Sequence, residues 1–341
     1  MRILVTGGAG FIGSNFVRQV LQDHPTDKIL IVDKLTYAGN LRNLEGPLQD
    51  SRVQFVRMDI SDPRVSEVLT DCDAVVHFAA ESHVDRSIED ATPFVRTNVE
   101  GTWRLLDACR SAGLSRFVHV STDEVYGSLG PMVKATESSP LAPTSPYAAS
   151  KAASDLLVLS AVKTHGFPAI ITRCTNNYGP YQFPEKFIPL MISQALAGQS
   201  LPVYGDGRNI RDWIHVQDHC RAIDLILRKG NGGEIYNIGG GCELENITVA
   251  RKILAALNRP ESLLKFVTDR LAHDRRYALD CTKLKTELGW RPTCEFGRGL
   301  ADTIRWYQEN SAWLQETRSG EYLKYFDRHY ANRGAAQIQC N

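Results

Sequence analysis

The chain of 341 residues is long enough to bury a substantial core, in one large domain or two modest ones. Its 39 basic and 39 acidic residues cancel, so no overall field recruits nucleic acid or an anionic membrane. No stretch is apolar over the length that a transmembrane helix requires.

The eight cysteines are scattered, without CxxC pairs or a framework spacing. In a chain too long to need covalent crosslinks, this pattern is typical of reduced thiols in a cytosolic protein. Met1 is followed at once by an apolar stretch, which leaves no room for a signal peptide. These features predict a cytoplasmic location.

Residues 2–6 predict a short β-strand, and a glycine-rich turn follows directly. Gly7, Gly10 and Gly13 stand in a G-x-x-G-x-x-G arrangement that opens an amphipathic helix. Glycine there permits a tight turn, close approach of the backbone to a pyrophosphate and close packing of the helix on the sheet. The strand before it and the helix after it supply the context that favours a dinucleotide site.

The second predicted strand, residues 29–32, ends at Asp33. A carboxylate there accepts hydrogen bonds from a ribose diol and repels a 2′-phosphate, which favours NAD over NADP. Lys34 beside it weakens that preference. Asp59 follows the predicted strand at 53–57, and it is equally compatible with a contact to adenine and with a polar turn.

The next predicted strand, residues 74–77, leads into the run Phe78 to Ser82, where small residues would let the backbone approach a cofactor. A helix is predicted over about residues 93–112. Strands and helices alternate through residue 173. This alternation predicts an α/β fold of the Rossmann type, with a doubly wound parallel sheet.

An apolar run at 117–120 predicts a buried strand, which ends in four polar side chains: Ser121, Thr122, Asp123 and Glu124. In an open parallel sheet, groups at the carboxyl end of a strand face the ligand crevice. We therefore expect these hydroxyl and carboxyl groups beside a bound ligand.

Ser145 and Pro146 begin a predicted helix on which Tyr147 and Lys151 are spaced i and i+4, so both lie on one face. An ammonium group favours the ionised form of a neighbouring phenol. Tyr147 is thus a candidate base toward a hydroxyl whose carbon loses hydride to a nicotinamide. Y-x-x-x-K alone is equally compatible with an exposed helix that carries the pair by chance, and the preceding S-T-D-E run favours catalysis.

Beyond Arg173 the sequence predicts a smaller mixed α/β lobe that is interleaved with the sheet. A turn-rich passage comes first, and short strands then alternate with helices. The expected division is 1–175 for dinucleotide binding and the catalytic motifs, mainly 176–333 for the reaction partner, and a frayed tail at 334–341.

Five basic residues of this lobe lie in or beside predicted turns: Lys186, Arg211, Arg270, Arg275 and Arg276. If several converge, they form a diphosphate site through charge-assisted hydrogen bonds. Any one of them alone is better explained as a solvated charge.

Other clusters favour structural roles, and no metal site is expected. His215 and His219 have a metal-ligand spacing but no third ligand. His83, Asp85 and Arg86 predict a polar loop network. The remaining candidates are aromatic residues that predict packing along a C-terminal helix: Trp290, Trp306, Tyr307 and Trp313.

Motifs across almost the whole chain resemble the extended short-chain dehydrogenase/reductase family, and within it the dTDP-glucose 4,6-dehydratases. They are VTGGAGFIGS at 5–14, DKLTYAGN at 33–40, FAAESHVDRSI at 78–88, STDEVYG at 121–127, YAASK at 147–151, NNYGPYQFPEK at 176–186, HDRRYALD at 273–280 and RSGEY at 318–322. The S-T-D-E run is the specific part, because epimerases of this superfamily lack the acidic pair. Two positions depart from the family: Leu271-Ala272 replaces Pro-Gly in a nucleotide-contact loop, and Thr175 replaces Ser.

The resemblance implies conversion of dTDP-glucose to dTDP-4-keto-6-deoxyglucose and water, with a tightly held NAD that is regenerated each cycle. Tyr147, assisted by Lys151 and Thr122, would remove the 4-hydroxyl proton while C4 is oxidised. Glu124 would take the acidified C5 proton and Asp123 would protonate the departing 6-hydroxyl. One carboxyl must therefore be ionised and the other protonated.

The resemblance also carries over contact residues. Together with the glycines, the expected cofactor contacts are Gly7, Gly10, Phe11, Ile12, Gly13, Asp33, Lys34, Leu35, Thr36, Asp59, Ile60, Phe78, Ala79, Ala80, Ser82, Thr97, Tyr147, Lys151 and Asn177. The expected substrate contacts are Ser82, Thr122, Asn176, Lys186, Phe187, Pro202, Val203, Tyr204, Arg211, Asn246, Asp269, Arg270 and His273.

The family pairs its protomers through helices equivalent to those around 95–112 and 148–164, which implies a homodimer. The second helix carries apolar residues that suit an interface or a core-facing helix alike: Leu156, Leu157, Leu159 and Val162.

Two alternatives stay open. The first is a related enzyme on the same fold, a 4-epimerase or a dehydratase acting on UDP-glucose or an N-acetylated sugar nucleotide. Asp123 and Glu124 argue against the epimerase. The second is a non-catalytic NAD-binding regulator, which the fold alone would allow. Such a protein need not keep the tyrosine, the lysine and both carboxyls together.

Overall fold

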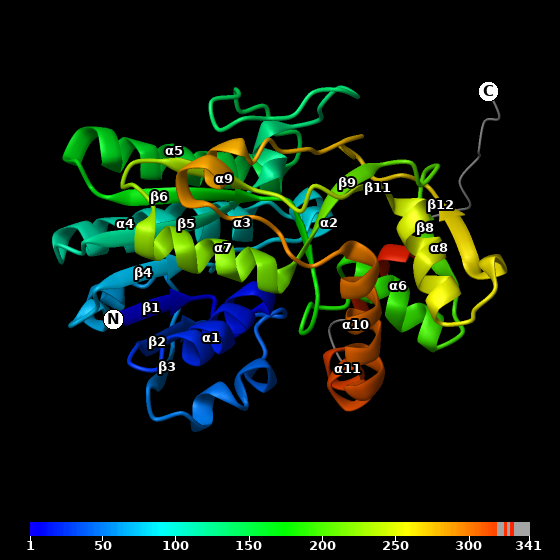
Figure 1. Ribbon diagram of the computed structural model, residues 1–341, viewed down its shortest axis with the longest axis horizontal. Coiled ribbons are helices and arrows are strands. Elements are labelled where there is room, and N and C mark those ends of the chain that lie inside the picture. The colour runs from blue at the N-terminus through cyan, green and yellow to red at the C-terminus, as the bar shows by residue number, and fades with distance from the viewer. Residues whose placement is uncertain (319–323, 326–327, 331–341) are drawn as a thin grey trace.

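The computed structural model describes residues 1–318, 324–325 and 328–330, and it is built around one parallel sheet (Figure 1). The strand order β10-β6-β5-β4-β1-β2-β3 is that of a doubly wound fold, so the predicted Rossmann-type architecture is confirmed. The strands are β1 (Arg2–Thr6), β2 (Lys28–Asp33), β3 (Val53–Arg57), β4 (Ala74–His77), β5 (Arg116–Thr122), β6 (Ala169–Cys174) and β10 (Ile235–Ile238).

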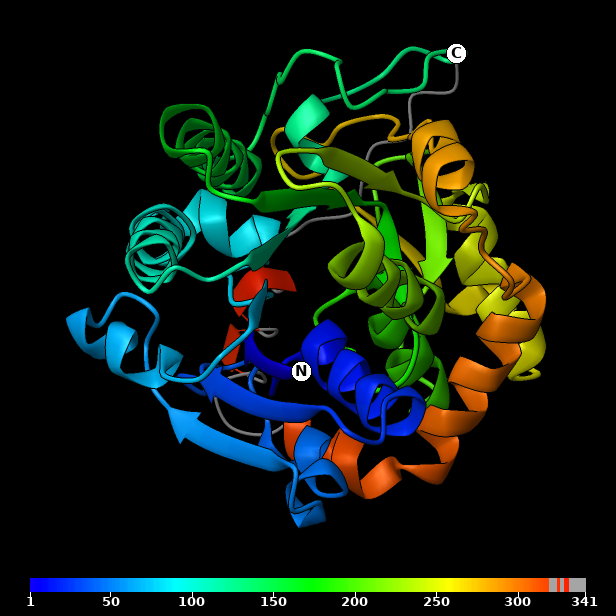
Figure 2. The same cartoon turned by 60° about the vertical axis from the view of Figure 1, so that its left-hand side comes forward.

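Helices cover both faces of this sheet (Figure 2). Helices α1 (Phe11–Asp23) and α7 (Val216–Lys229) pack side by side on one face. On the other face lie α4 (Thr102–Ser111) and α5 (Pro146–His165). Because both faces are buried, the strands are continuous apolar runs whose side chains alternate between two cores, as Val5 and Leu4 do.

The helix that the sequence predicts over 93–112 is not one α-helix. Residues 92–94 form the short α3 (Thr92–Phe94), a π-helix spans Val95–Gly101, and α4 continues from there. At Gly101 an added Cβ would lie 2.9 Å from the side chain of Ile60, so the π-helix packs closely against the segment that follows β3. Short π segments recur at functional sites, and this one carries the buried residues Thr97 and Asn98.

The smaller lobe is mixed, as the sequence predicts. A three-stranded sheet and a parallel strand pair are backed by helices (Figure 1). Its elements are β7 (Asn176–Tyr178), β8 (Leu201–Tyr204), β9 (Ile210–His215), β11 (Glu243–Glu245), β12 (Leu264–Val267), α6 (Phe187–Leu196), α8 (Asn246–Ala256), α10 (Phe296–Glu309) and α11 (Ser311–Thr317). Between them the chain returns to the main sheet for α7 and β10, and α9 (Thr282–Leu288) packs beside β10.

The aromatic residues of the C-terminal region do pack, but not all in one place. Trp306, Tyr307 and Trp313 join Tyr181 in the core of the smaller lobe. Trp290 instead packs in the core between the main sheet and helices α1 and α7, so its predicted place along a C-terminal helix is wrong. The predicted tail at 334–341 lies outside the described residues.

The helices within the described part of the chain include none that is long and apolar enough to cross a membrane.

Candidate active site

The turn from β1 to α1 leaves space only for glycine. Gly7 has φ +69°, and a Cβ added there would lie 2.6 Å from the backbone nitrogen of Ala79. At Gly13 an added Cβ would lie 2.3 Å from the carbonyl oxygen of Gly7. The N-cap residue of α1 is Gly10, so no side chain of that residue bonds the N–H groups of the first helical turn. The first turn can therefore offer its backbone N–H groups to a pyrophosphate.

Asp33, at the end of β2, has its carboxylate held in place by backbone hydrogen bonds. Its carboxylate accepts from the backbone N–H of Ala9 at 3.0 Å and of Leu35 at 2.8 Å. Lys34 forms an ion pair with Asp59 at 3.2 Å. That pairing engages the ammonium that weakened the sequence argument, so the arrangement suits a free 2′-hydroxyl and thus NAD.

One cavity at the carboxyl ends of the strands brings together all the expected cofactor residues except Leu35. Leu35 has φ +58° and does not line the cavity. Its backbone N–H donates to the Asp33 carboxylate. The close glycine turn, the oriented carboxylate and this shared cavity together fit a dinucleotide.

The S-T-D-E run and the Y-x-x-x-K pair meet in the same cavity. Strand β5 ends at Thr122, whose hydroxyl lies 3.3 Å from Asp123 Oδ1 and 3.3 Å from the backbone nitrogen of Glu124. Helix α5 starts where the sequence predicts, because the Ser145 hydroxyl accepts from the N–H of Ala148 and Pro146 follows the cap.

The electrostatics of Tyr147 differ from the sequence argument, which expects Lys151 to lower the phenol pKa. Burial raises the pKa of Tyr147 well above its usual value, and the charge of Glu124 raises it further. Lys151 donates to the carbonyl oxygen of Val120 at 2.8 Å, and burial lowers its own pKa to about 8. In the protein alone, Tyr147 is therefore held neutral.

The two adjacent carboxyl groups occupy different environments. Burial raises the pKa of Asp123 well above its usual value, and the charge of Glu124 adds to the effect. Burial also raises the pKa of Glu124, but Arg270, Lys186 and Arg211 oppose that rise. Of the two carboxyls, Asp123 is thus the more strongly held in its protonated form, whereas three cations favour the ionised form of Glu124.

A second cavity adjoins the first, and Glu124, Asn176 and Lys186 line both. It collects nine of the expected substrate residues: Asn176, Lys186, Phe187, Pro202, Tyr204, Arg211, Asn246, Arg270 and His273. Ser82 and Thr122 line the first cavity. The two cavities together place the carboxyl of Glu124 at the junction of the cavity that gathers the expected cofactor residues and the cavity that gathers most of the expected substrate residues.

Two expected substrate contacts line neither cavity. Val203 is 1% exposed and points into the protein. Asp269 instead holds its neighbours, since its carboxylate pairs with His273 Nδ1 at 2.6 Å and accepts from the N–H of Arg270 at 2.8 Å. The same turn contains Ala272 at φ +50°, a left-handed conformation that alanine adopts at a cost.

Three of the five basic residues converge on the second cavity, namely Lys186, Arg211 and Arg270. The other two do not. Arg275 pairs with Asp206 at 2.8 Å, and Arg276 pairs with Glu243 at 2.7 Å. The sequence pattern cannot separate the two groups, because all five flank turns.

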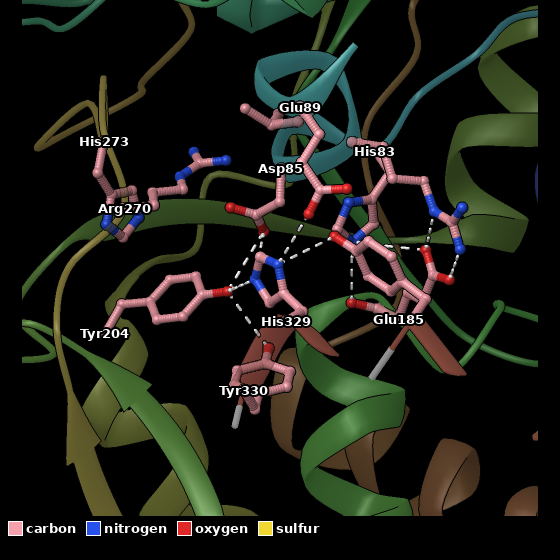
Figure 3. A network of polar contacts seen from close by, with 12 residues as sticks. His83, Asp85, Glu89, Glu185, Tyr204, Arg270, His273, His329 and Tyr330 are labelled. Atoms are coloured by element: carbon pink, nitrogen blue, oxygen red, sulfur yellow. Dashed lines mark hydrogen bonds and ion pairs between the residues drawn. The ribbon is translucent and has the colours of Figure 1, made fainter. Parts of the chain in front are cut away.

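The histidine clusters take part in polar networks. His219 Nδ1 lies 2.9 Å from Asn177 Oδ1 and His215 caps α7, and no three metal-ligating side chains gather within the described ranges. The predicted loop network forms around α2 (Val84–Glu89), with His83 beside Glu185 and with Asp85 beside Tyr204 and His329 (Figure 3).

Sequence reasoning assigned no role to several residues that border or brace the site. Tyr37 and Glu81 line the first cavity, and Tyr277 lines the second. Asn98 is fully buried and bonds both backbone groups of Glu81. Tyr37 and Tyr277 stand inside the DKLTYAGN and HDRRYALD motifs, which were the available signal, but loop periodicity does not reveal which way a ring points.

A glycine turn fitted to a dinucleotide, a buried Tyr-Lys pair and an adjoining basic cavity define a short-chain dehydrogenase/reductase of the extended class. Comparison with known proteins agrees. The family model described as GDP-mannose 4,6 dehydratase matches residues 4–303. A dTDP-glucose 4,6-dehydratase of Streptomyces niveus is 53% identical over 325 residues, which cover 94% of this chain and 96% of the relative.

Solved structures extend the comparison. DesIV, a dTDP-glucose 4,6-dehydratase from Streptomyces venezuelae crystallised with NAD, matches with a TM-score of 0.91 and 54% identity, over 93% of this chain and 100% of that chain. A UDP-glucuronic acid 4-epimerase from Bacillus cereus matches with a TM-score of 0.86 and 29% identity, over 91% and 99% of the two chains. The chain belongs to the dTDP-glucose 4,6-dehydratase family, and the resemblance inferred from the sequence is confirmed.

Proposed function

We propose that this protein converts dTDP-glucose to dTDP-4-keto-6-deoxyglucose and water, with NAD as a resident cofactor. The family membership and the NAD-bound relative support this activity. The observation that carries it is the position of Asp123 and Glu124, two adjacent carboxyls in different environments where the first cavity meets the second. An epimerase has no use for such a pair, since it removes no water.

The residues that would hold NAD are those of the glycine turn, Asp33 and the first cavity. Bound NAD supplies the acceptor for the hydride of C4 and later the donor for C6. Tyr147 takes the proton of the 4-hydroxyl, with its phenol oriented by the Thr122 hydroxyl. The hydrogen bond with Thr122 lowers the pKa of Tyr147 and so opposes the burial that holds the phenol neutral. Lys151 lies one helical turn away and is the assisting residue that the family resemblance implies.

The carboxyl pair carries out the elimination. The new 4-ketone acidifies the hydrogen on C5, and ionised Glu124 removes it. Asp123 gives its proton to the departing 6-hydroxyl, so the C6–O bond breaks and water leaves. Glu124 then returns its proton to C5 as C6 is reduced. The proton gained by Tyr147 balances the proton lost from Asp123, and the net change is the loss of one water.

Mass spectrometry of the reaction with dTDP-glucose, beside UDP-glucose and with no NAD added, tests this proposal. We expect the thymidine compound to lose the mass of one water, which requires both the chemistry and a retained cofactor. No loss of water from any sugar nucleotide, even with NAD added, would contradict the proposal and favour a binding role.

We further propose a homodimer formed through α4, α5 and the π-helix between α3 and α4. Val95, Trp103 and Leu156 are 55%, 48% and 57% exposed on these neighbouring helices, and large exposed apolar side chains that cluster mark interfaces. Leu159 and Val162 pack into the core instead. Sedimentation of Trp103→Glu beside the unaltered protein tests this, and an unchanged molecular mass would contradict it.

We also propose a cytoplasmic location. The support is chemical: the cysteines of the described ranges all carry free thiols, several of them buried, which suits a reducing compartment.

A further inference from the structure

Arg86, on α2, joins segments that lie far apart in the sequence. Its Nε donates to Glu185 Oε2 at 3.0 Å, and a terminal nitrogen bonds the other carboxylate oxygen. Its guanidinium carbon lies 4.1 Å from the ring centre of Tyr37 and 4.0 Å from that of Tyr325. The Arg86 guanidinium is thus held by a bidentate ion pair and by the faces of two aromatic rings.

Two of these partners belong to different walls of the cofactor cavity. Tyr37 lies in the wall formed by residues 36–39, after β2, and Glu185 in the wall formed by residues 182–186, before α6. Phe183 from the second wall meets the Tyr37 ring edge to face, with centroids 5.7 Å apart. Arg86 therefore ties the ribose side of the cavity to the side nearest the substrate.

Glu185, the acidic partner of Arg86, is buried, and it lines the second cavity as well as the first. The Glu185 side chain is 3% exposed, against 23% for Arg86. His83 pairs with Glu185. Tyr325, which stacks on Arg86, lies 3.3 Å from His329 Nδ1, and His329 contacts Asp85 and Tyr204 in the network of Figure 3. The next residue in the chain, Lys186, donates to the carbonyl oxygen of Ser82. The tie is thus braced on the substrate side by residues that line both cavities.

We propose that Arg86 is a positioning residue for cofactor retention, which holds the two walls of the dinucleotide cavity together so that NAD leaves slowly. This inference rests on the proposed function, because the hydride taken from C4 must return to C6 of the same sugar. A cofactor that left between these steps would strand a 4-keto intermediate. Arginine suits the role because only its planar fork can bond both carboxylate oxygens while it stacks on rings.

The test compares how long purified variants keep their NAD. Arg86→Ala, Arg86→Lys and Tyr37→Leu are dialysed at length, and NAD is measured in the denatured extract at successive times. We expect release to be roughly tenfold faster or more, because a charge-assisted pair and a ring contact are lost. Arg251→Ala, which removes an exposed pair with Glu261, serves as the matched control.

The turnover assay gives a second readout. Arg86→Ala should need added NAD for sustained turnover, and added NAD should restore most of the rate. A folded Arg86→Ala that releases NAD at the wild-type rate would overturn the proposal. If that variant fails to fold, Glu185→Gln decides in its place, since it keeps the size of the side chain but removes the ion pair: faster release supports the tie, and wild-type release refutes it. Retention is measured without substrate, so a wild type that dehydrates nothing would sink the proposed function and leave this result intact.

Discussion

The two cavities that meet at Glu124 are built by different means. At the ends of the parallel strands, the cofactor side uses close backbone turns and small residues, such as the turn at Gly7 and the run at Ala79 and Ala80. The substrate side is made of long side chains from separate segments, among them Arg211, Arg270 and His273. The first is fixed by topology and close packing, whereas the second depends on individual side chains. Variants of the two sides should therefore fail differently.

The largest effect is expected between the cavities, at Tyr147. Tyr147→Phe removes the proposed base and leaves the ring packed against Phe94. We expect kcat to fall by about 10²–10⁴-fold with the NAD content of the purified protein unchanged. A rate assay and an NAD assay on the same sample check this, and a variant with near-normal kcat would remove Tyr147 from the mechanism.

On the cofactor side, adding a single methyl group to a glycine should be enough to disrupt the site. Gly7 and Gly113 have nearly equal positive φ angles, +69° and +67°, but an added Cβ meets Ala79 at the first and no atom within 4 Å at the second. Gly113→Ala should cost about 1–2 kcal/mol of unfolding free energy for the left-handed conformation alone. Gly7→Ala should cost about 1–3 kcal/mol more for the clash and should lose NAD. Equal stability losses in denaturant titrations, with NAD kept in both, would show that the close approach is unimportant.

On the substrate side, a change of one side chain should weaken substrate binding without loss of the cofactor. Arg211 donates to the carbonyl oxygens of Ile210 and Asp274 and lies over the ring of Tyr277. Arg211→Lys keeps the charge but not the fork. We expect KM for dTDP-glucose to rise roughly tenfold to a hundredfold, the loss of one hydrogen bond of about 1.5–3 kcal/mol. NAD content should stay at the wild-type level, and a parallel loss of NAD would contradict the separation of the two sides.

The smallest effect is a displaced pH profile. Burial raises the pKa of Glu124, and Arg270 followed by Lys186 lowers it. Glu124 must be ionised to act, so activity falls as the pH drops through its pKa. Lys186→Met removes a cation that stabilises the carboxylate, so that pKa should rise and the acid limb of kcat should move to higher pH. A limb that stays in place, measured at saturating substrate, would mean that another group sets it.

The same contrast explains what the sequence could predict. The alternating strands, the glycine turn and the polar end of β5 follow from periodicity and chain order, so they could be predicted. The interruption by the π-helix could not, because the spacing of apolar residues over 93–112 is compatible with an ordinary α-helix. Nor could the difference between Arg270 and Arg275, which flank one turn but face the cavity and Asp206 respectively. The tie at Arg86 needs four distant segments brought together, which no local pattern reports.

The central claim is that one site oxidises C4, expels water and returns the same hydride to C6 before the cofactor exchanges. The most direct test mixes dTDP-glucose carrying deuterium at C4 with undeuterated dTDP-glucose labelled throughout with carbon-13, and examines the products by mass spectrometry and NMR. We predict deuterium at C6 of the product with ordinary carbon and none in the carbon-13 product. Deuterium in the carbon-13 product would show that hydride passes between substrate molecules, which contradicts a retained cofactor.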